Sequence, residues 1–275
     1  MTLKRYTGKS FGLEMLMLAA TLAVAFPLYI LINLSLRPRN SEQSLLAPTS
    51  NPTFDNYSTA WSDAGLGRAL LNSTFVTVVS VLIIIAVSSL AAYVLARVTA
   101  RWSKVTFFVV MIGLLLPFQL ALLPLYTTIR DLELIGSLWA LILFYSGLQV
   151  PFATFLYVGF LRGLPKDYEE AAMLDGCGPL TAFRSVVFPL LRPITGTVII
   201  LNAVFVWNDF FTPLLYLSGT ETATMPLAIS TFVAQYTSNF NVVFAGLLIG
   251  ILPVLVVYFL MQRSIIKGFS GGLKA

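Results

Sequence analysis

Six long apolar runs, separated by short polar segments, organise the sequence. Each run reaches the roughly 20 residues that a helix needs to cross a hydrocarbon layer of about 30 Å. The runs are residues 13–36, 69–96, 105–126, 137–160, 194–217 and 241–261. Because lipid offers the backbone no hydrogen-bond partners, each run is expected to form a helix. The pattern predicts an all-α polytopic membrane protein with about six transmembrane helices.

The first run also has features of a secretory signal peptide. Lys4, Arg5 and Lys9 precede it, and residues 23–25 resemble a small-residue cleavage site. The apolar stretch, however, continues to Leu36, so cleavage would leave half a membrane span exposed. We therefore expect an uncleaved first helix.

Composition and charge support a membrane location and predict an orientation. Apolar residues make up 57% of the chain and charged residues only 11%, whereas a soluble domain carries charge at about a quarter of its positions. Of the 17 lysines and arginines, all but four fall in the segments on one side of the six runs. The four exceptions are Arg37, Arg39, Arg68 and Arg130. Since cytoplasmic loops carry the excess of basic residues, both termini are expected in the cytoplasm.

The residue inventory argues against an enzyme and against a resident cofactor. The chain has no histidine and one cysteine, Cys177, so the commonest general base and metal ligand are missing. Gly8, Lys9 and Ser10 resemble the end of a phosphate-binding loop, but the glycine required five positions earlier is replaced by Leu3. We expect no nucleotide or metal site in this chain, and no nucleic-acid partner.

The chain is expected to form a single transmembrane domain over residues 1–275. Segments 37–68 and 218–240 carry Pro, Asn, Ser and Thr and are interpreted as solvated outer loops. The one long cytoplasmic connection covers about residues 161–193.

Local signals within segment 161–193 predict two short helices joined by a glycine corner. Asp167, followed three residues later by Glu170, is typical of a capping box at a helix start. Gly176 and Gly178 are expected to end that helix, and Pro179 suits the first turn of the next. Apolar residues then recur at helical spacing, at Leu180, Phe183, Val187 and Leu190.

Two interpretations of this segment remain open on physical grounds. It is either a structured loop packed on its own helix ends, or a docking element for a partner protein. For docking, Ala171 and Ala172 are small enough for a partner groove to approach the backbone, and Glu170 and Asp175 would pair with or cap groups on the partner.

The same residues resemble the EAA signature of ABC importer permeases. That signature runs Glu-Ala-Ala, three residues, Gly, nine residues, an aliphatic residue, one residue, Leu-Pro. The chain supplies residues 170–172, Gly176, Val186 and Phe188-Pro189, with phenylalanine in place of the usual leucine. The resemblance implies that segment 161–193, hereafter the coupling loop, contacts a separate ATPase. The residues expected to do so are Glu170, Ala171, Ala172, Asp175, Gly176, Arg184 and Pro189.

The resemblance extends over most of the chain and points to sugar-importer permeases of the MalG type. It is carried by residues 56–57, 124–126, 207–210, 213–214, 226–227, 262–263 and 267–274. It implies an assembly with an ATP-binding-cassette ATPase dimer that binds ATP and Mg, a second related permease and an extracytoplasmic sugar-binding protein. This chain would then be a multi-pass subunit in a prokaryotic plasma membrane, surrounded by lipid.

Polar groups inside the runs are candidates for the substrate path. Asp209 is the one acid placed well inside a run, beside Asn208, and a carboxylate there costs about 3 kcal/mol on insertion scales. Asn208 and Asp209 either line the path and bind sugar hydroxyls or form hydrogen bonds between helices. Weaker candidates are Gln119, Tyr145, Gln149 and Asn202. Pro117 and Pro124 are expected to distort the third run.

Together these observations predict the permease subunit of an ABC importer that moves a carbohydrate, such as an oligosaccharide, by alternating access. An ion-coupled secondary transporter is the alternative. Such a transporter needs charged groups within the membrane to carry the coupling ion, and Asp209 is a lone candidate.

Overall fold

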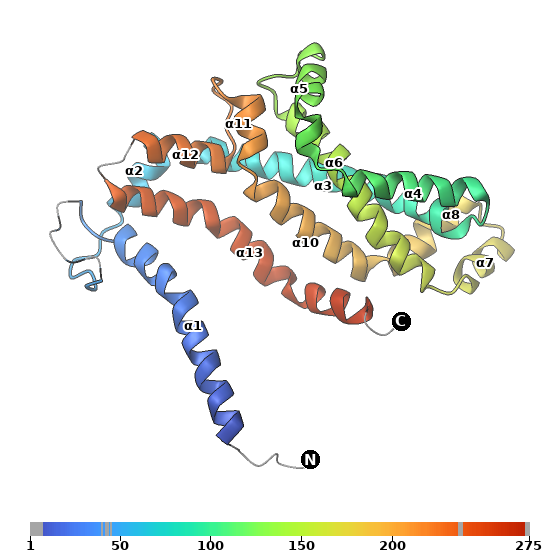
Figure 1. The fold of residues 1–275 in the computed structure, drawn as a ribbon, viewed down its shortest axis with the longest axis horizontal. Helices are drawn as coiled ribbons and strands as arrows, with labels where there is room; N and C mark the ends of the chain where they lie inside the picture. Colours follow the sequence, from blue (N-terminus) through green and yellow to red (C-terminus); the bar gives the residue numbers. More distant parts are fainter. Residues whose placement is uncertain (1–7, 40, 42–43, 45, 236–238, 273–275) are drawn as a thin grey trace. The chain divides into compact units, whose positions relative to one another are not determined.

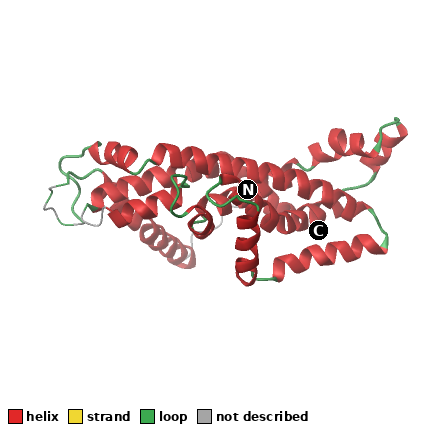
Figure 2. Cartoon of the chain, turned by 90° about the horizontal axis from the view of Figure 1, so that it is seen from above, coloured by secondary structure: helices red, strands yellow, loops and turns green. Residues whose placement is uncertain are grey.

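The computed structural model describes residues 8–39, 41, 44, 46–235 and 239–272. Every regular element in these residues is helical (Figure 2). The longer helices are α1 (Gly8–Ser35), α3 (Leu66–Arg97), α4 (Arg101–Leu115), α6 (Leu138–Arg162), α10 (Arg192–Asn208) and α13 (Phe240–Gly272). The shorter elements are α2 (Asp55–Asp63), η1 (Phe118–Ala121), α5 (Leu122–Asp131), α7 (Asp167–Leu174), α8 (Pro179–Ala182), the π-helical η2 (Phe183–Val187), α9 (Phe188–Leu190), α11 (Phe211–Leu217) and α12 (Met225–Gln235).

The predicted all-α membrane fold is confirmed. Four of the described helices, α1, α3, α6 and α13, are long and apolar enough to cross a membrane. The number rises to six if each of two bent helix pairs counts as one span. The first pair joins α4 to residues 118–131 through a bend of 90°, and the second joins residues 179–190 to α10 through a bend of 75°.

The first bend confirms the predicted distortion of the third run. Leu116 follows α4 with extended backbone angles, φ −78° and ψ 123°, as expected of a residue before a proline. Pro117 then opens the 3-10 turn η1.

The prediction that Asp209 lies inside a continuous fifth span is wrong. The helix stops at Asn208, and Asp209 has extended backbone angles of φ −71° and ψ 123°. The chain resumes as α11 at Phe211. Apolar residues on both sides of the break made the run look continuous, because hydropathy does not report backbone conformation.

Two other predictions need correction. The outer segments expected as loops contain helices α2 and α12. The capping box is also absent, since the residue that precedes α7 is Lys166, in helical conformation and without a side-chain cap. Asp167 is therefore the first helical residue, and its carboxylate stands too far along the helix to act as the cap.

The chain divides into two compact units, which are described separately. Unit 1 comprises residues 1–67 and 228–252. Its interior includes Ala60 from α2, Phe232 from α12 and Ala245 from α13. Gly246 lies close to both Phe232 and Ala60, so its lack of a side chain allows α13 to approach them.

A polar network orders the backbone after α1 in unit 1. Arg37 is 2% exposed and donates to the carbonyls of Ser44 and Ala47. Asn56, fully buried in α2, donates to the carbonyls of Ser35 and Arg37. This segment is thus held by buried hydrogen bonds, although its composition is that of a solvated loop.

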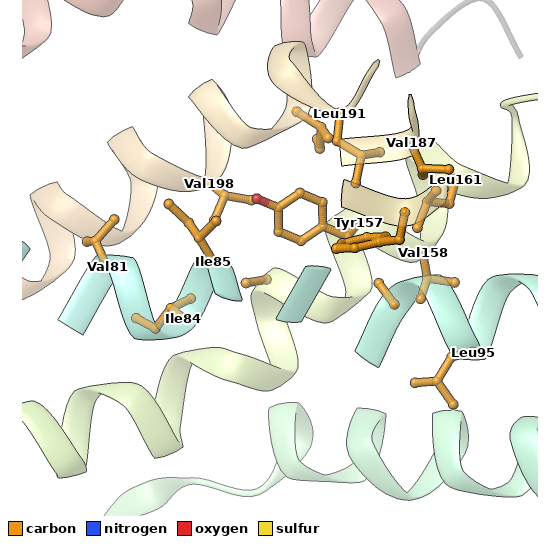
Figure 3. Close-up of a cluster of buried hydrophobic side chains, with 14 residues drawn as sticks. Val81, Ile84, Ile85, Leu95, Tyr157, Val158, Leu161, Val187, Leu191 and Val198 are labelled. Atoms are coloured by element: carbon orange, nitrogen blue, oxygen red, sulfur yellow. The ribbon is translucent and has the colours of Figure 1, made fainter. Parts of the chain in front are cut away.

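Unit 2 comprises residues 68–227 and 253–275, and its helices α3, α6 and α10 run alongside one another (Figure 1). At one end, beside α7 and α8, these helices bury a cluster that we call the loop-end core. Figure 3 shows Tyr157 of α6 in its midst, and the Tyr157 hydroxyl donates to Thr195. The cluster consists of Val81, Ile84, Ile85, Ala92, Leu95, Ala153, Tyr157, Val158, Leu161, Phe183, Val187, Leu191, Ile194 and Val198.

A second cluster in unit 2, the cavity-end core, involves the other ends of α3, α6 and α10. It also takes in α5 and α11. Its members are Val76, Ile129, Ala140, Leu141, Ile142, Phe144, Tyr145, Val206, Tyr216, Leu217 and Leu227. The three shared helices thereby connect the coupling loop to the two helix breaks.

Candidate functional site

Two adjoining cavities in unit 2 lie at the helix breaks. Their volumes are about 400 Å³ and about 460 Å³. Phe118, Leu148 and Phe205 line both cavities, so the two form neighbouring parts of one hollow. The 400 Å³ cavity, hereafter the first, is also lined by Phe144, Val204, Asn208, Asp209 and Thr212. The 460 Å³ cavity, the second, is also lined by Gly113, Leu114, Leu116, Pro117, Gln119, Gln149 and Phe152.

Two interruptions of the membrane helices border this hollow, whereas the 75° bend between residues 190 and 192 lies at the coupling loop. Leu116 and Pro117 belong to the break after α4, and Asn208 and Asp209 belong to the break after α10. Backbone outside a regular helix is tolerated at membrane depth where it lines a cavity or is covered by protein. The breaks thus place polar groups and main chain beside apolar walls.

Asp209 is held by two hydrogen bonds. The Tyr145 hydroxyl of α6 donates to Asp209 Oδ2 at 2.9 Å, and the Phe211 amide donates to Oδ1 at 3.0 Å. The second bond satisfies one of the free amides at the start of α11. The helix-to-helix contact considered for Asp209 is therefore present, and the same side chain also borders the first cavity.

The other path candidates lie in different surroundings. Asn208 borders the first cavity, and its Nδ2 donates back to the Val204 carbonyl at 2.9 Å. Gln119 lines the second cavity. Asn202 is 1% exposed, donates to the Val198 carbonyl and lines neither cavity. The structure thus brings Asn208 and Asp209 together, with Gln119 in the adjoining cavity, and separates Asn202 from them.

Sequence reasoning missed the aromatic walls and Thr212. Phe118, Phe144 and Phe205 line the first cavity, but in an apolar run such residues are indistinguishable from lipid-facing ones. Thr212 follows Asp209 by three residues, a spacing that would place both on one side of a helical turn. This three-residue spacing from Asp209 was the sequence signal that could have identified Thr212.

The coupling loop has the predicted glycine corner. Helix α7 ends at Leu174, and Gly176 has φ +86°, a conformation open to glycine at little cost. The Gly176 amide donates to the Met173 carbonyl and the Cys177 amide donates to the Ala172 carbonyl. These two bonds form a Schellman motif. Gly178 then precedes α8, with Pro179 at its first position as predicted.

The second half of the loop is less regular than expected. Residues 183–187 form a π-helical turn between α8 and α9. Pro189 has no amide hydrogen to donate to the carbonyl four residues earlier, which belongs to Ser185 within that turn. A missing bond of this kind favours a wider turn.

The predicted coupling residues differ in exposure. Glu170, Ala171, Asp175, Gly176 and Arg184 are exposed, Pro189 is half-buried and Ala172 is buried. The exposed group is therefore available to a partner, whereas Ala172 packs inward.

Apolar residues of the loop that the sequence did not single out are also exposed. Leu174 is 89% exposed, and Leu180, Tyr168 and Met173 are exposed as well. Large apolar side chains that are exposed together on one segment are a feature of interaction sites.

Similar proteins identify the family. A family profile described as "Binding-protein-dependent transport system inner membrane component" matches residues 84–269, which include both cavities and the coupling loop. The chain belongs to this family of importer permeases.

Relatives of this permease cover nearly its whole length. It is 34% identical to the melibiose/raffinose/stachyose import permease protein MelC of Bacillus subtilis, over 93% of this chain and 94% of MelC. It is 33% identical to the multiple sugar-binding transport system permease protein MsmG of Streptococcus mutans, over 95% of this chain and 96% of MsmG. A crystal structure of a bacterial ABC transporter involved in the import of the acidic polysaccharide alginate shares the fold. The TM-score is 0.83 at 21% identity, over 95% of this chain and 99% of the other.

Family membership confirms several predictions. The permease is a transport subunit of an ABC importer and not an enzyme, and it is a multi-pass protein of the bacterial plasma membrane. Permeases of this family carry no cofactor, because a partner ATPase binds the nucleotide. Its partners are that ATPase and a substrate-binding protein. The ion-coupled alternative has no support from the family.

Proposed function

We propose that this permease conducts an uncharged oligosaccharide through the hollow at its helix breaks. The observation that carries the proposal is the lining: aromatic rings from three elements face the same space as Asn208, Asp209 and Thr212. Aromatic faces suit the C–H surfaces of sugar rings, and a few convergent polar groups fix the orientation of a ligand.

The charge of the lining favours a neutral cargo. Among the residues that the structure describes, Asp209 is the one ionisable group lining either cavity. Its two carboxylate oxygens already accept hydrogen bonds from Tyr145 and Phe211. Since none of these lining residues is basic, an anionic sugar would meet the Asp209 carboxylate without a neutralising partner and be repelled. One relative, MelC, is named for the import of melibiose, raffinose and stachyose, which are neutral sugars.

A transport assay with purified components tests the cargo. The permease is reconstituted into vesicles with its ATPase, its binding protein and a second permease, and uptake of labelled raffinose is compared with uptake of an acidic trisaccharide. ATP-dependent uptake of raffinose alone is the expected result. Preference for the acidic sugar would overturn the assignment of a neutral cargo.

The mechanism we propose is alternating access by the whole chain, residues 1–275, acting as one permease domain. ATP draws the two ATPases together, the coupling loops move with them, and paired permeases expose the hollow to one side and then the other. The exposed positions Glu170, Ala171, Asp175, Gly176 and Arg184, supported by Ala172 and Pro189, are proposed to form the contact with the ATPase.

We also propose that the coupling loop and both termini are cytoplasmic. The bias of basic residues supports this orientation. Lys4, Arg5 and Lys274, which contribute to that bias, lie outside the described residues.

Cys177 provides a direct test, since it is the single cysteine in the sequence and is partly exposed. A membrane-impermeant thiol reagent should label it in opened cells and not in intact cells. A Cys177→Ser chain with Ser218→Cys, an exposed position in the opposite set of segments, should show labelling in intact cells. Labelling of Cys177 in intact cells would contradict the proposed orientation.

Asp209 variants separate its two candidate roles. If Asp209 binds cargo, Asp209→Ala should raise the sugar concentration for half-maximal uptake about tenfold, since a hydrogen bond to a charged group contributes about 1.5–3 kcal/mol. Asp209→Asn, which keeps the size and an acceptor oxygen, should raise it less. Wild-type affinity and rate in both variants, at normal expression, would leave Asp209 with a packing role alone.

A further inference from the structure

A buried ion pair fastens the coupling loop to a helix that does not adjoin it in sequence. Arg97, the last residue of α3, places its Nε 2.6 Å from Oε1 of Glu169 in α7. The remaining guanidinium nitrogens donate to the carbonyls of Leu161 at 3.0 Å and Leu164 at 3.1 Å. One side chain thus joins the end of α3, the end of α6 and the first turn of α7.

The burial of this pair distinguishes it from the exposed pair Arg68–Glu221. The exposed fraction is 12% for the Arg97 side chain and 7% for that of Glu169, whereas the pair Arg68–Glu221 is exposed at 70% and 95%. Exposed pairs contribute little, but removing one member of a buried pair leaves an uncompensated charge. The geometry is also favourable for the helix dipoles, with a cation at the ends of α3 and α6 and an anion at the start of α7.

The last turn of α3 contacts the second half of the coupling loop as well. Tyr93, one turn before Arg97, interacts with Glu169 and packs against Phe183, with 5.1 Å between ring centroids. Phe183 opens the π-helical turn and is buried in the loop-end core. Both halves of the loop therefore rest on the same turn of α3.

The two sides of α7 have different surroundings. Glu169 and Ala172 are its buried residues and face the helices of unit 2, whereas Glu170 and Leu174 are exposed. The chain itself ties the loop to α6 before it and to α10 after it, and the Arg97–Glu169 pair adds a connection to α3.

We propose that Arg97 and Glu169 are positioning residues that transmit movement of the coupling loop to α3. The inference rests on the proposed function, in which a partner ATPase moves the exposed side of α7. With the pair intact, α3, α6 and α10 move with the loop as one body, and the far ends of these helices reshape the hollow. Without the pair, the loop follows the ATPase while α3 lags behind.

The test compares Glu169→Gln with Asp167→Asn in the reconstituted transporter. Asp167 is an exposed acid in the same helical turn, so its variant controls for loss of charge. In Glu169→Gln, raffinose moved per ATP hydrolysed should fall about tenfold, within the range of measured coupling effects, while ATP turnover stays near wild type. Asp167→Asn should keep the wild-type ratio. A wild-type ratio in Glu169→Gln would overturn the proposal.

A distance measurement checks the connection without any transport. Nitroxide labels are placed on Cys177 and on Val78→Cys, an exposed position of α3. In the wild-type background the distance distribution should stay narrow with and without ATP, and in Glu169→Gln it should broaden when ATP is added. An equally narrow distribution in the variant would contradict the proposed role of the pair. Failure of the unmodified transporter to move raffinose would instead count against the proposed cargo.

The double variant Arg97→Met/Glu169→Met covers the case in which a single variant does not fold. Removing both charges avoids an unpaired buried ion, and such replacements often preserve stability. We expect normal expression and a raffinose-to-ATP ratio still about fivefold below wild type. Full recovery of the ratio would show that packing alone transmits the movement and would overturn the assignment of the ion pair.

Discussion

The loop-end core and the cavity-end core are built by the same three helices but differ in how they treat polar groups. At the loop end, mainly aliphatic side chains surround a single central tyrosine, and the bend that leads into α10 is buried at Leu191 (Figure 3). At the cavity end, two spans break, a carboxylate is held between α6 and α11, and two cavities remain. The comparison shows one end with a mainly aliphatic core and another that holds a carboxylate beside two cavities.

Packing explains why these ends suit different tasks. Interiors without voids transmit displacement because side chains have nowhere to move. Side chains that line a cavity, in contrast, have packing partners on one side only. Their rearrangement therefore costs less free energy. A movement that enters at the loop end is therefore expected to change shape mainly at the cavity end.

The largest effect is expected from Gly176→Val at the loop end. Gly176 has φ +86°, and a β-carbon added there would meet no atom within 4 Å, so the penalty is conformational, about 1–2 kcal/mol or more for a β-branched residue. Raffinose uptake and co-purification with the ATPase should both fall severalfold. Gly178→Val is the matched control, since φ −70° and ψ 161° suit valine and no atom lies within 4 Å. Equal activity in the two variants would contradict the need for this corner.

A smaller effect is expected from Pro117→Ala at the cavity end. Without the proline, Leu116 is no longer kept out of the helical region, and α4 gains freedom to extend into the break. Uptake should fall about threefold because the hollow changes shape. This decrease corresponds to a free-energy change of a fraction of a kcal/mol. Pro124→Ala, in the first turn of α5 where no helical bond is lost, should leave uptake unchanged. An effect of Pro124→Ala as large as that of Pro117→Ala would remove the significance given to the break.

A pair of tyrosine variants compares hydrogen bonding at the two ends. Tyr145→Phe removes a bond to the Asp209 carboxylate, and Tyr157→Phe removes a bond to the Thr195 hydroxyl. Bonds to charged groups contribute about 1.5–3 kcal/mol and neutral ones about 0.5–1.5 kcal/mol. Unfolding in detergent, followed by tryptophan fluorescence, should show the larger loss for Tyr145→Phe. The reverse order would mean that Asp209 is neutral or finds another donor.

Glu133→Gly is expected to stabilise the protein and to leave transport unaffected. Glu133 follows α5 with φ 57°, and its amide donates to Arg130 while the Leu134 amide donates to Ile129. This is the same corner that Gly176 forms in the coupling loop, but with a side chain in the left-handed region. Glycine there should stabilise the protein by about 1 kcal/mol without changing uptake, as measured by the same unfolding assay. Loss of stability would show that the Glu133 side chain has a compensating contact.

Hydropathy was sufficient to predict the helical class and the approximate spans, because long apolar runs have few alternatives in lipid. It was insufficient at Asp209, which lies in extended backbone outside the helix and accepts a hydrogen bond from the Phe211 amide. The motif spacing located the glycine corner, since Gly176 and Pro179 have strong local preferences. The start of α7 at Asp167 could not be found in this way, because the preceding residue, Lys166, makes no side-chain cap.

The Arg97–Glu169 pair was invisible in the sequence for a different reason. Arg97 contributed to the bias of basic residues, and Glu169 stood beside the more recognisable Glu170. Two residues 72 positions apart form no local sequence pattern. Oppositely charged residues with such a sequence separation are also common. The available signal was the spacing of Glu169 and Ala172, three residues apart and both on the buried side of α7.

The length of α3 has a consequence for the position of the Arg97–Glu169 pair in the membrane. Its 32 residues extend about 48 Å at 1.5 Å per residue. Even at a tilt of about 40°, the upper end of the usual range, it spans about 37 Å along the bilayer normal, against a hydrocarbon thickness of about 30 Å. Part of α3 must therefore stand among the lipid headgroups, and each end carries an arginine that hydrocarbon would reject, Arg68 at one end and Arg97 at the other. The Arg97 side chain is only 12% exposed and contacts Glu169 and two carbonyl oxygens, so little of its guanidinium is open to lipid phosphates.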